Sequence, residues 1–210
     1  VRVLDTVPAE LRAGVFAESG RRYEAWVRFS NGSEQPGPDA EGDGRGMAIK
    51  LLGVAGSPSG MQDFLLINHP VFFVRDAADY VDFQTASPTW RFFAPSFNPF
   101  ALRLREALIA RRITRQEVRN PLSIRYWSMT PYACGGVACK FSARPLPPSS
   151  RYTAAEGPHF LRANLASHLA EAEARFEFMA QPRTDAAAMP IEDPRIPWDV
   201  AASPFVPVAE

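Results

Sequence analysis

Two residues in this chain have types and spacing suited to binding an anion. Arg28 and Ser30 lie two positions apart in the run Val27-Arg28-Phe29-Ser30. Side chains of a strand alternate between its faces, so these two share one face. If that face points into a barrel, the arginine needs an anion there, because an unpaired buried charge is unfavourable. The spacing leaves two alternatives open, a bound anionic ligand and a salt bridge to one of the 23 carboxylates.

The pair Asn68-His69 also suggests chemistry, because it interrupts an otherwise apolar run from Phe64 to Val74. A buried polar group without a partner destabilises a fold by about 1–3 kcal/mol, so both side chains are either paired structurally or kept for catalysis. A single histidine beside a proline more often has a structural role. No serine or cysteine lies in a nucleophile elbow, so the sequence does not support triad hydrolysis.

Two cysteines, Cys134 and Cys139, flank Gly135-Gly136. Two glycines suit a two-residue hairpin turn, because both central positions need positive φ. In that register the sulfurs are diagonal, with Cα atoms about 7 Å apart, which exceeds comfortable disulfide geometry. Two cysteines also fall short of a four-ligand zinc site. We expect free thiols in a reducing, cytoplasmic compartment, in agreement with the absence of a visible signal peptide.

The elements that must position these residues are mostly short strands, rich in β-branched and aromatic residues and separated by 20 prolines and 13 glycines. The predicted strands are Tyr23 to Ser30, Met47 to Val54, Pro70 to Arg75, Leu122 to Thr130, Val137 to Ala143 and Arg175 to Pro182. The predicted helices are Ala77 to Thr85, Pro99 to Arg115 and Glu156 to Ala174. Groups of strands with helices between them indicate an α+β fold, an antiparallel barrel or sandwich with helical additions.

Composition narrows the classes of partner. The chain has 210 residues, enough for one domain with a substantial core, and 23 basic residues balance 23 acidic ones. Balanced charge provides no general attraction to nucleic acid or anionic lipid. The arginine-rich stretch 103–119 lacks the interleaved aromatic residues of a nucleic-acid site. No apolar run reaches the roughly 20 residues that cross a bilayer. We expect neither a nucleic-acid partner nor a membrane span.

Three segments, taken together and in this order, resemble the catalase superfamily of haem proteins. They are Val27 to Ser30, then Gly42 to Lys50, then Asn68 to Asp76. Catalases carry a similar Val-Arg-Phe-Ser strand, an Asp-Pro-Arg-Gly-Phe-Ala-Val-Lys-Phe strand and an Asn-Asn-Thr-Pro segment followed by Phe-Phe-Ile-Arg-Asp. The resemblance covers about the first 85 residues, and the remainder looks like smaller catalase-related proteins of bacteria.

The resemblance implies an antiparallel β-barrel that encloses one haem b, held by a proximal tyrosinate, with a histidine and an asparagine on the distal side. Arg28 matches the arginine that binds a haem propionate, and Ser30 matches the serine of the distal pocket. Phe72, Tyr80 and Phe83 match the aromatic residues that pack against the porphyrin. On this interpretation, the anion required by Arg28 is a propionate.

The chain departs from the family pattern in two ways. Counting back from the shared Pro70, the distal asparagine falls on Ile67, so Asn68 reaches the iron only after a one-residue shift of the backbone. In addition, no histidine precedes His69, and the proximal motif Arg-x-x-x-Tyr is absent. We interpret residues 1–210 as a single, incomplete catalase-like domain whose proximal tyrosine lies beyond residue 210.

For the complete protein, the resemblance implies an enzyme that consumes hydrogen peroxide or an organic hydroperoxide, as a catalase or a peroxidase. Asn68 is the catalytic residue that this chain would contribute. Two alternatives remain open, the rearrangement of fatty-acid hydroperoxides and a barrel that binds haem or another apolar ligand without turnover. Many relatives are oligomers, so a homo-oligomer is one of the implied assemblies. The fragment alone is expected to be inactive.

Overall fold

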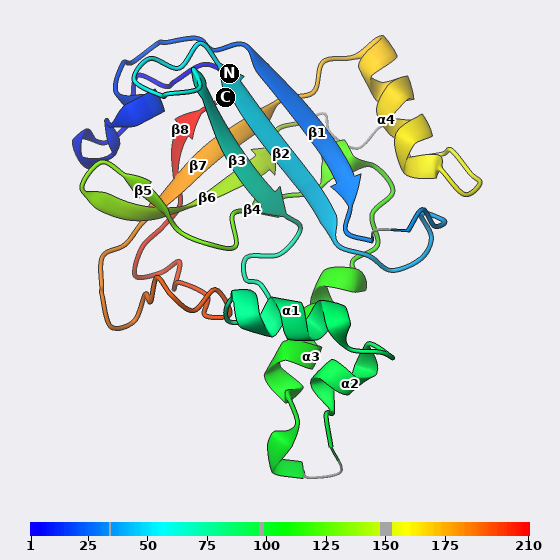
Figure 1. Cartoon of the computed structure of the whole chain (residues 1–210). Coiled ribbons are helices and arrows are strands. Elements are labelled where there is room, and N and C mark those ends of the chain that lie inside the picture. Colours follow the sequence, from blue (N-terminus) through cyan, green and yellow to red (C-terminus); the bar gives the residue numbers. More distant parts are fainter. Residues whose placement is uncertain (34, 97–98, 148–152) are drawn as a thin grey trace.

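The computed structural model describes residues 1–33, 35–96, 99–147 and 153–210, which form one antiparallel sheet with helices gathered mainly at one end (Figure 1). The strands are β1 (Ala25–Asn31), β2 (Arg45–Leu52), β3 (Met61–Ile67), β4 (Tyr126–Trp127), β5 (Tyr132–Cys134), β6 (Val137–Pro145), β7 (Phe176–Pro182) and β8 (Val206–Ala209). Every pairing between these strands is antiparallel. The predicted mixture of helices with an antiparallel sheet is confirmed.

The predicted barrel is wrong in one respect, because the sheet does not close. Its order is β1-β2-β3-β4-β6-β7-β8, with β5 paired to β6, so β1 and β8 are the two ends. The first residues of the chain lie between these ends, where they form only the isolated bridges Arg2↔Arg22 and Val3↔Ala209 and no named strand. Backbone hydrogen bonds, such as that from the Leu4 amide to the Val208 carbonyl oxygen at 2.9 Å, connect them to β8. Both chain termini lie side by side at this seam (Figure 1).

The inner side of the curved sheet holds the main core. Met47, Ile49 and Leu51 alternate with less buried residues along β2, as expected for a strand with one covered face. The rings of Phe64, Phe141 and Phe178 meet at centroid distances of 5.0–5.3 Å. Each of these rings stabilises the fold by about 1.5–3 kcal/mol through burial.

The helices and 3-10 turns (η) mostly follow the expected order. They are η1 (Ala9–Leu11), η2 (Gly14–Phe16), α1 (Ala77–Thr85), α2 (Trp90–Phe93), η3 (Pro99–Ala101), α3 (Leu104–Thr114), η4 (Pro121–Ser123) and α4 (Phe160–Glu171). The span of α1 is the predicted one, and Asp76 caps it by accepting a hydrogen bond from the Asp79 amide. The other two predicted helices are shorter. The first is divided into η3 and α3, and the second begins as α4 only after Pro158. Among the described helices, none is long and apolar enough to cross a membrane.

The prediction of a strand over Pro70 to Arg75 is wrong. This segment is an irregular connection that enters a second core, where Val71, Phe73 and Val74 pack with residues of α2 and α3. Its continuous apolar character reflects burial among helices and not a sheet covered on both faces. The Phe72 amide donates to the Pro194 carbonyl oxygen at 3.1 Å, so even its backbone pairs with a loop.

Two further strand predictions need correction. The segment Leu122 to Thr130 contains the turn η4 and only the two-residue strand β4. In contrast, β3 and β8 were not predicted. The Gly135-Gly136 hairpin is confirmed between β5 and β6, although only Gly135 has positive φ, at 60°. Cys134 and Cys139 are free, as expected, and both are buried.

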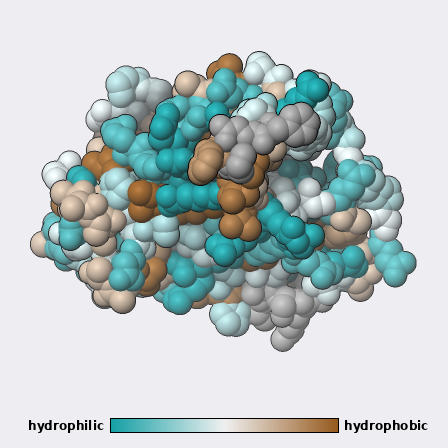
Figure 2. Space-filling view, turned by 90° about the horizontal axis from the view of Figure 1, so that it is seen from below, coloured by the Kyte–Doolittle hydropathy of each residue, from teal (hydrophilic) through white to brown (hydrophobic). Residues whose placement is uncertain are grey.

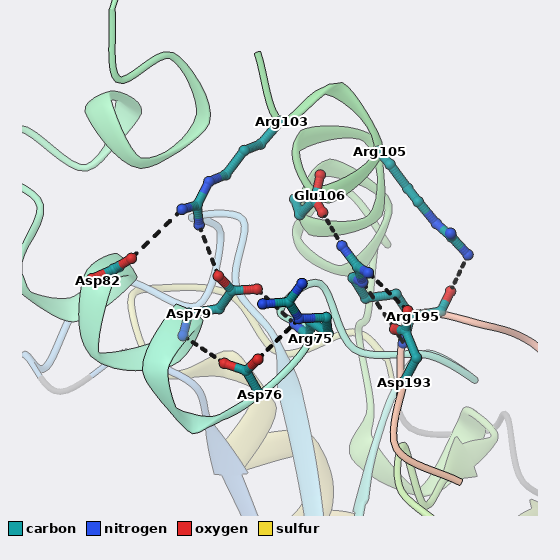
Figure 3. Close-up of polar contacts among 9 residues, drawn as sticks. All are labelled: Arg75, Asp76, Asp79, Asp82, Arg103, Arg105, Glu106, Asp193 and Arg195. Atoms are coloured by element: carbon teal, nitrogen blue, oxygen red, sulfur yellow. Dashed lines mark hydrogen bonds and ion pairs between the residues drawn. The ribbon is translucent and has the colours of Figure 1, made fainter. Parts of the chain in front are cut away.

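Ion pairs connect the helical end to the segment before β8 (Figure 3). Arg195 pairs with Glu106 of α3 and with Asp193, and Arg103 pairs with Asp79 of α1 at 3.3 Å. The Arg105 guanidinium also donates to the Arg195 carbonyl oxygen at 2.8 Å.

The helical end, seen from below in Figure 2, shows a small group of hydrophobic side chains on a mostly hydrophilic face.

Candidate functional site

Arg28 lies in a row of three directly paired residues on the outer side of the sheet, Arg28↔Ala48↔Leu65. Its neighbour Phe29 packs on the inner core, so alternation directs Arg28 away from that core. The expectation that Arg28 points into a barrel is therefore wrong. Arg28 is exposed, and it forms no hydrogen bond or ion pair with any residue that the structure describes.

The adjacent row on the same side is Ser30↔Gly46↔Ile67. A Cβ atom on Gly46 would lie 2.7 Å from the Ser30 hydroxyl oxygen, closer than real side chains approach. Gly46 and Ala48 have small side chains or none, so the surface of β2 is lower here than at the larger side chains of β1 and β3. Ile67 is also paired with Trp127 of β4, which extends the apolar surface sideways.

We call the outer side of β1, β2 and β3 the open face. It is defined by Trp26, Arg28, Ser30, Gly46, Ala48, Leu65 and Ile67. Trp26 is 72% exposed and Leu65 is 56% exposed, which is unusual for large apolar side chains of a sheet. At the edge of this face, Lys50 and Asp63 form an ion pair at 2.9 Å. The open face therefore combines apolar area with one unpaired positive charge.

The outer side of β6 and β7 is different, because the segment before β8 covers it. Gln181 donates to the carbonyl oxygens of Trp198 and Ser203, and Lys140 donates to that of Ile196 at 3.1 Å. Burial lowers the pKa of Lys140 to about 8. The outer side of β6 and β7 is therefore covered, whereas the outer side of β1, β2 and β3 is not. For this reason the open face is the candidate binding surface.

Asn68 is only 4% exposed and is directed away from the open face. Its side-chain oxygen accepts a hydrogen bond from the Arg45 amide at 3.0 Å. Its side-chain nitrogen donates to the Ile113 carbonyl oxygen and to the Gln116 side chain, both at 2.9 Å. These bonds connect the end of β3 to α3. Asn68 therefore fastens the sheet to the helical end, and Ile67 takes the place facing the open face.

His69 is also held locally. Its Nδ1 atom lies 2.9 Å from the Val71 carbonyl oxygen and 3.3 Å from the Val71 amide. Burial is the main cause that lowers the pKa of His69, and nearby Arg112 lowers it further, while the contact with Val71 raises it. This geometry agrees with a structural role for His69.

The three aromatic residues expected at a porphyrin lie together at the helical end. The rings of Phe72 and Tyr80 are 6.2 Å apart, and those of Tyr80 and Phe83 are 6.4 Å apart. Phe72, Phe83 and Ile67 all pack against the second core. Because Ile67 also belongs to the open face, this residue connects the aromatic group with the sheet pair Arg28 and Ser30.

Residue types alone did not reveal Ala48 or Leu65 as parts of the site. The pairing of β2 with β3 brings Ala48 and Leu65 beside Arg28, and that register is a property of the fold. Among the described residues, no group of three or more histidine, cysteine, aspartate or glutamate side chains could hold a metal ion.

Comparisons with known proteins show that part of this chain is similar to catalases. A family model described as catalase matches residues 2–89. A catalase of Methanosarcina barkeri is 38% identical over 73 residues, which are 34% of this chain and 14% of that protein. A bromoperoxidase-catalase of Streptomyces venezuelae is 28% identical over 149 residues, 70% of this chain and 26% of that protein.

The fold comparison extends over the whole chain. The structure of a bacterial catalase superposes with a TM-score of 0.73 and 18% identity, covering 100% of this chain and 45% of the other. This similarity supports the fold. The chain thus spans less than half of that catalase, and its alignments cover 14–26% of the curated relatives.

Proposed function

Residues 2–89 form a catalase-like region, and from this premise we propose that the complete protein is a haem-dependent oxidoreductase that consumes hydroperoxides. Hydrogen peroxide is the proposed substrate, with organic hydroperoxides as the wider class. The open face is the proposed surface for haem b. The observation that carries this proposal is an unpaired arginine beside bare apolar strands.

The residues of the open face fit the chemistry of haem. A porphyrin is a flat apolar ring that carries two carboxylates, and it needs a shallow surface with a cation at the rim. Gly46 and Ala48 provide the shallow part, and Leu65 and Trp26 provide apolar contact. Arg28 would bind a propionate through charge-assisted hydrogen bonds, which are the stronger kind.

The remaining roles belong to residues around this face. The Ser30 hydroxyl would hydrogen-bond a polar group bound above the face, and Phe72, Tyr80 and Phe83 would pack against the ring. Haem supplies the redox chemistry with peroxide when it is bound. The distal histidine and the proximal tyrosine are proposed to come from other segments of the complete protein.

The catalytic role of Asn68 stays a prediction. For Asn68 to orient a peroxide above the open face, its bonds to Arg45, Ile113 and Gln116 must first break. Ile67, which already faces that side, has no group that can bind a peroxide. This observation favours a second candidate function, a face that binds haem or another flat apolar ligand without turnover.

Another alternative, the conversion of fatty-acid hydroperoxides, requires a larger apolar space. A cavity of about 760 Å³ inside the curved sheet is lined in part by Val27, Met47, Ile49 and Phe178. Such a volume suits a chain-like apolar ligand. Comparing oxygen release from hydrogen peroxide with the loss of a fatty-acid hydroperoxide distinguishes this reaction from the main proposal.

The test is a titration of the full-length protein with haemin, followed by visible spectroscopy and by oxygen release after peroxide addition. We expect one haem per chain, and we expect Arg28→Ala to weaken haem binding by about tenfold. Arg111→Ala, which removes an exposed arginine of α3, is the control. Haem binding without peroxide consumption would support the non-catalytic candidate. The absence of a stoichiometric haem spectrum would overturn the haem-dependent proposal and leave only a face that binds another flat apolar ligand.

A further inference from the structure

A second cavity lies between the carboxyl end of β1, the start of β2 and α4, and its volume is about 400 Å³. It borders the open face at Ser30 but extends to the other side of β1, beneath α4. Its walls are mostly apolar and include Phe29, Tyr126, Leu161 and Leu165. Cavities of this size with a few polar groups are typical of sites for small molecules.

Arg45 is the buried charge in the wall of this cavity. It is 6% exposed, and no carboxylate of the described residues lies within ion-pair distance of it. Its guanidinium donates to the Asn31 side chain and to the carbonyl oxygens of Asp39 and Glu41. These are three bonds for five N–H donors, and the Nε atom has no acceptor.

The other charged groups around the cavity do not neutralise Arg45 directly. The Asp39 carboxylate is the one acidic group in the described wall, and it accepts hydrogen bonds from the Leu161 amide and the Asn31 side chain. Asn31 therefore stands between this carboxylate and Arg45. His159 and Arg162 lie exposed at the rim, and the Arg162 guanidinium places a positive charge at the entrance.

We propose that this cavity binds a small monocarboxylate with an apolar body, whose carboxylate pairs with Arg45. A buried guanidinium held only by neutral acceptors is stabilised by an anion, and the apolar walls favour a compact ring or short chain. The site does not depend on the proposed peroxide chemistry. It would be a separate ligand site at the junction of β1, β2 and α4.

Calorimetry with benzoate as the probe tests the site in the full-length protein. Benzoate should bind saturably at one site per chain, and benzamide, its uncharged analogue, should bind about tenfold more weakly or not at all. Leu165→Trp should abolish binding by filling the cavity. Leu169→Trp, one turn further along α4 and outside the cavity, should bind as the unmodified protein does.

The role of Arg45 is tested by nitrogen-15 NMR of arginine side chains. The Arg45 Nε–H signal, assigned by its loss in Arg45→Lys, should shift with benzoate and reach saturation in parallel with the calorimetric binding. Absence of saturable benzoate binding to the unmodified protein would overturn the proposal, as would unchanged binding to Leu165→Trp. Equal affinity for benzamide would also overturn the proposal, because it would show that the charge of the carboxylate does not contribute to binding.

Discussion

Asn68 illustrates how one amide joins two parts of the molecule. Its bonds to the Arg45 amide, to the Ile113 carbonyl oxygen and to Gln116 are all formed inside the protein. We expect Asn68→Ala to lower the free energy of unfolding by about 2–3 kcal/mol, because buried partners lose their hydrogen bonds. Chemical denaturation measures this change, and Gln84→Ala on the exposed side of α1 is the control.

The same variant separates the structural role from the catalytic one. If Asn68→Ala leaves the unfolding midpoint unchanged but removes the peroxide activity of the haem-loaded protein, Asn68 acts on peroxide and the structural interpretation fails. If stability falls while the remaining folded protein keeps its activity, the asparagine is a connection between sheet and helices.

Lys140 gives stability a defined dependence on pH. Burial lowers its pKa from 10.5 to about 8, so between these values the unfolded chain binds a proton that the folded chain does not. Lys140 should therefore contribute up to about 3 kcal/mol of added stability as pH increases from 8 to 10.5. Denaturation of Lys140→Met should lack this rise, whereas the exposed Lys50→Met should retain it. The same pH slope in all three proteins would contradict the assignment.

At the scale of elements, the ion pairs at Arg195 hold the segment before β8 against α3. Glu106 is buried, so Arg195→Gln would leave its carboxylate without this partner. We expect a loss of about 2 kcal/mol in unfolding free energy. Arg175→Gln removes an exposed pair with Glu173 and should change stability by less than about 1 kcal/mol. Equal effects of the two substitutions would show that burial of Glu106 is unimportant.

Alternation along β1 correctly predicted that Arg28 and Ser30 share a face, because side chains of a strand have a period of two. It could not predict which face meets the core, since that choice depends on the curvature of the whole sheet. The cross-strand neighbours Ala48 and Leu65 were likewise beyond the sequence, because β3 carries apolar residues on both of its faces and was not recognised.

The helix Ala77 to Thr85 was predicted over its observed span. The structure shows a local cause for its start, because the Asp76 side chain caps the first turn. The strand prediction for Pro70 to Arg75 failed because its signal was not a local one. Its hydrophobicity reports burial, and burial among helices gives the same pattern as burial in a sheet.

At the scale of the whole molecule, the two larger cores are separated by the end of β3. One core fills the inner side of the sheet, and the other lies among α1, α2, α3 and the connection that follows Asn68. We expect amide hydrogens of β2, β6 and β7 to exchange at least about tenfold more slowly than those of α1 and α3. Hydrogen-exchange NMR measures this difference, and uniform rates would show that both cores open together.

The division into two cores has a consequence for any ligand that touches both. A flat molecule resting on Arg28 and Ala48 while packing against Phe72 and Phe83 would bind only when the helical part is docked on the sheet. Occupancy and docking are then thermodynamically linked, and a ligand at 100 times its dissociation constant would stabilise the docked form by about 2.7 kcal/mol. The melting temperature of the helical part would report ligand binding, even without any catalysed reaction.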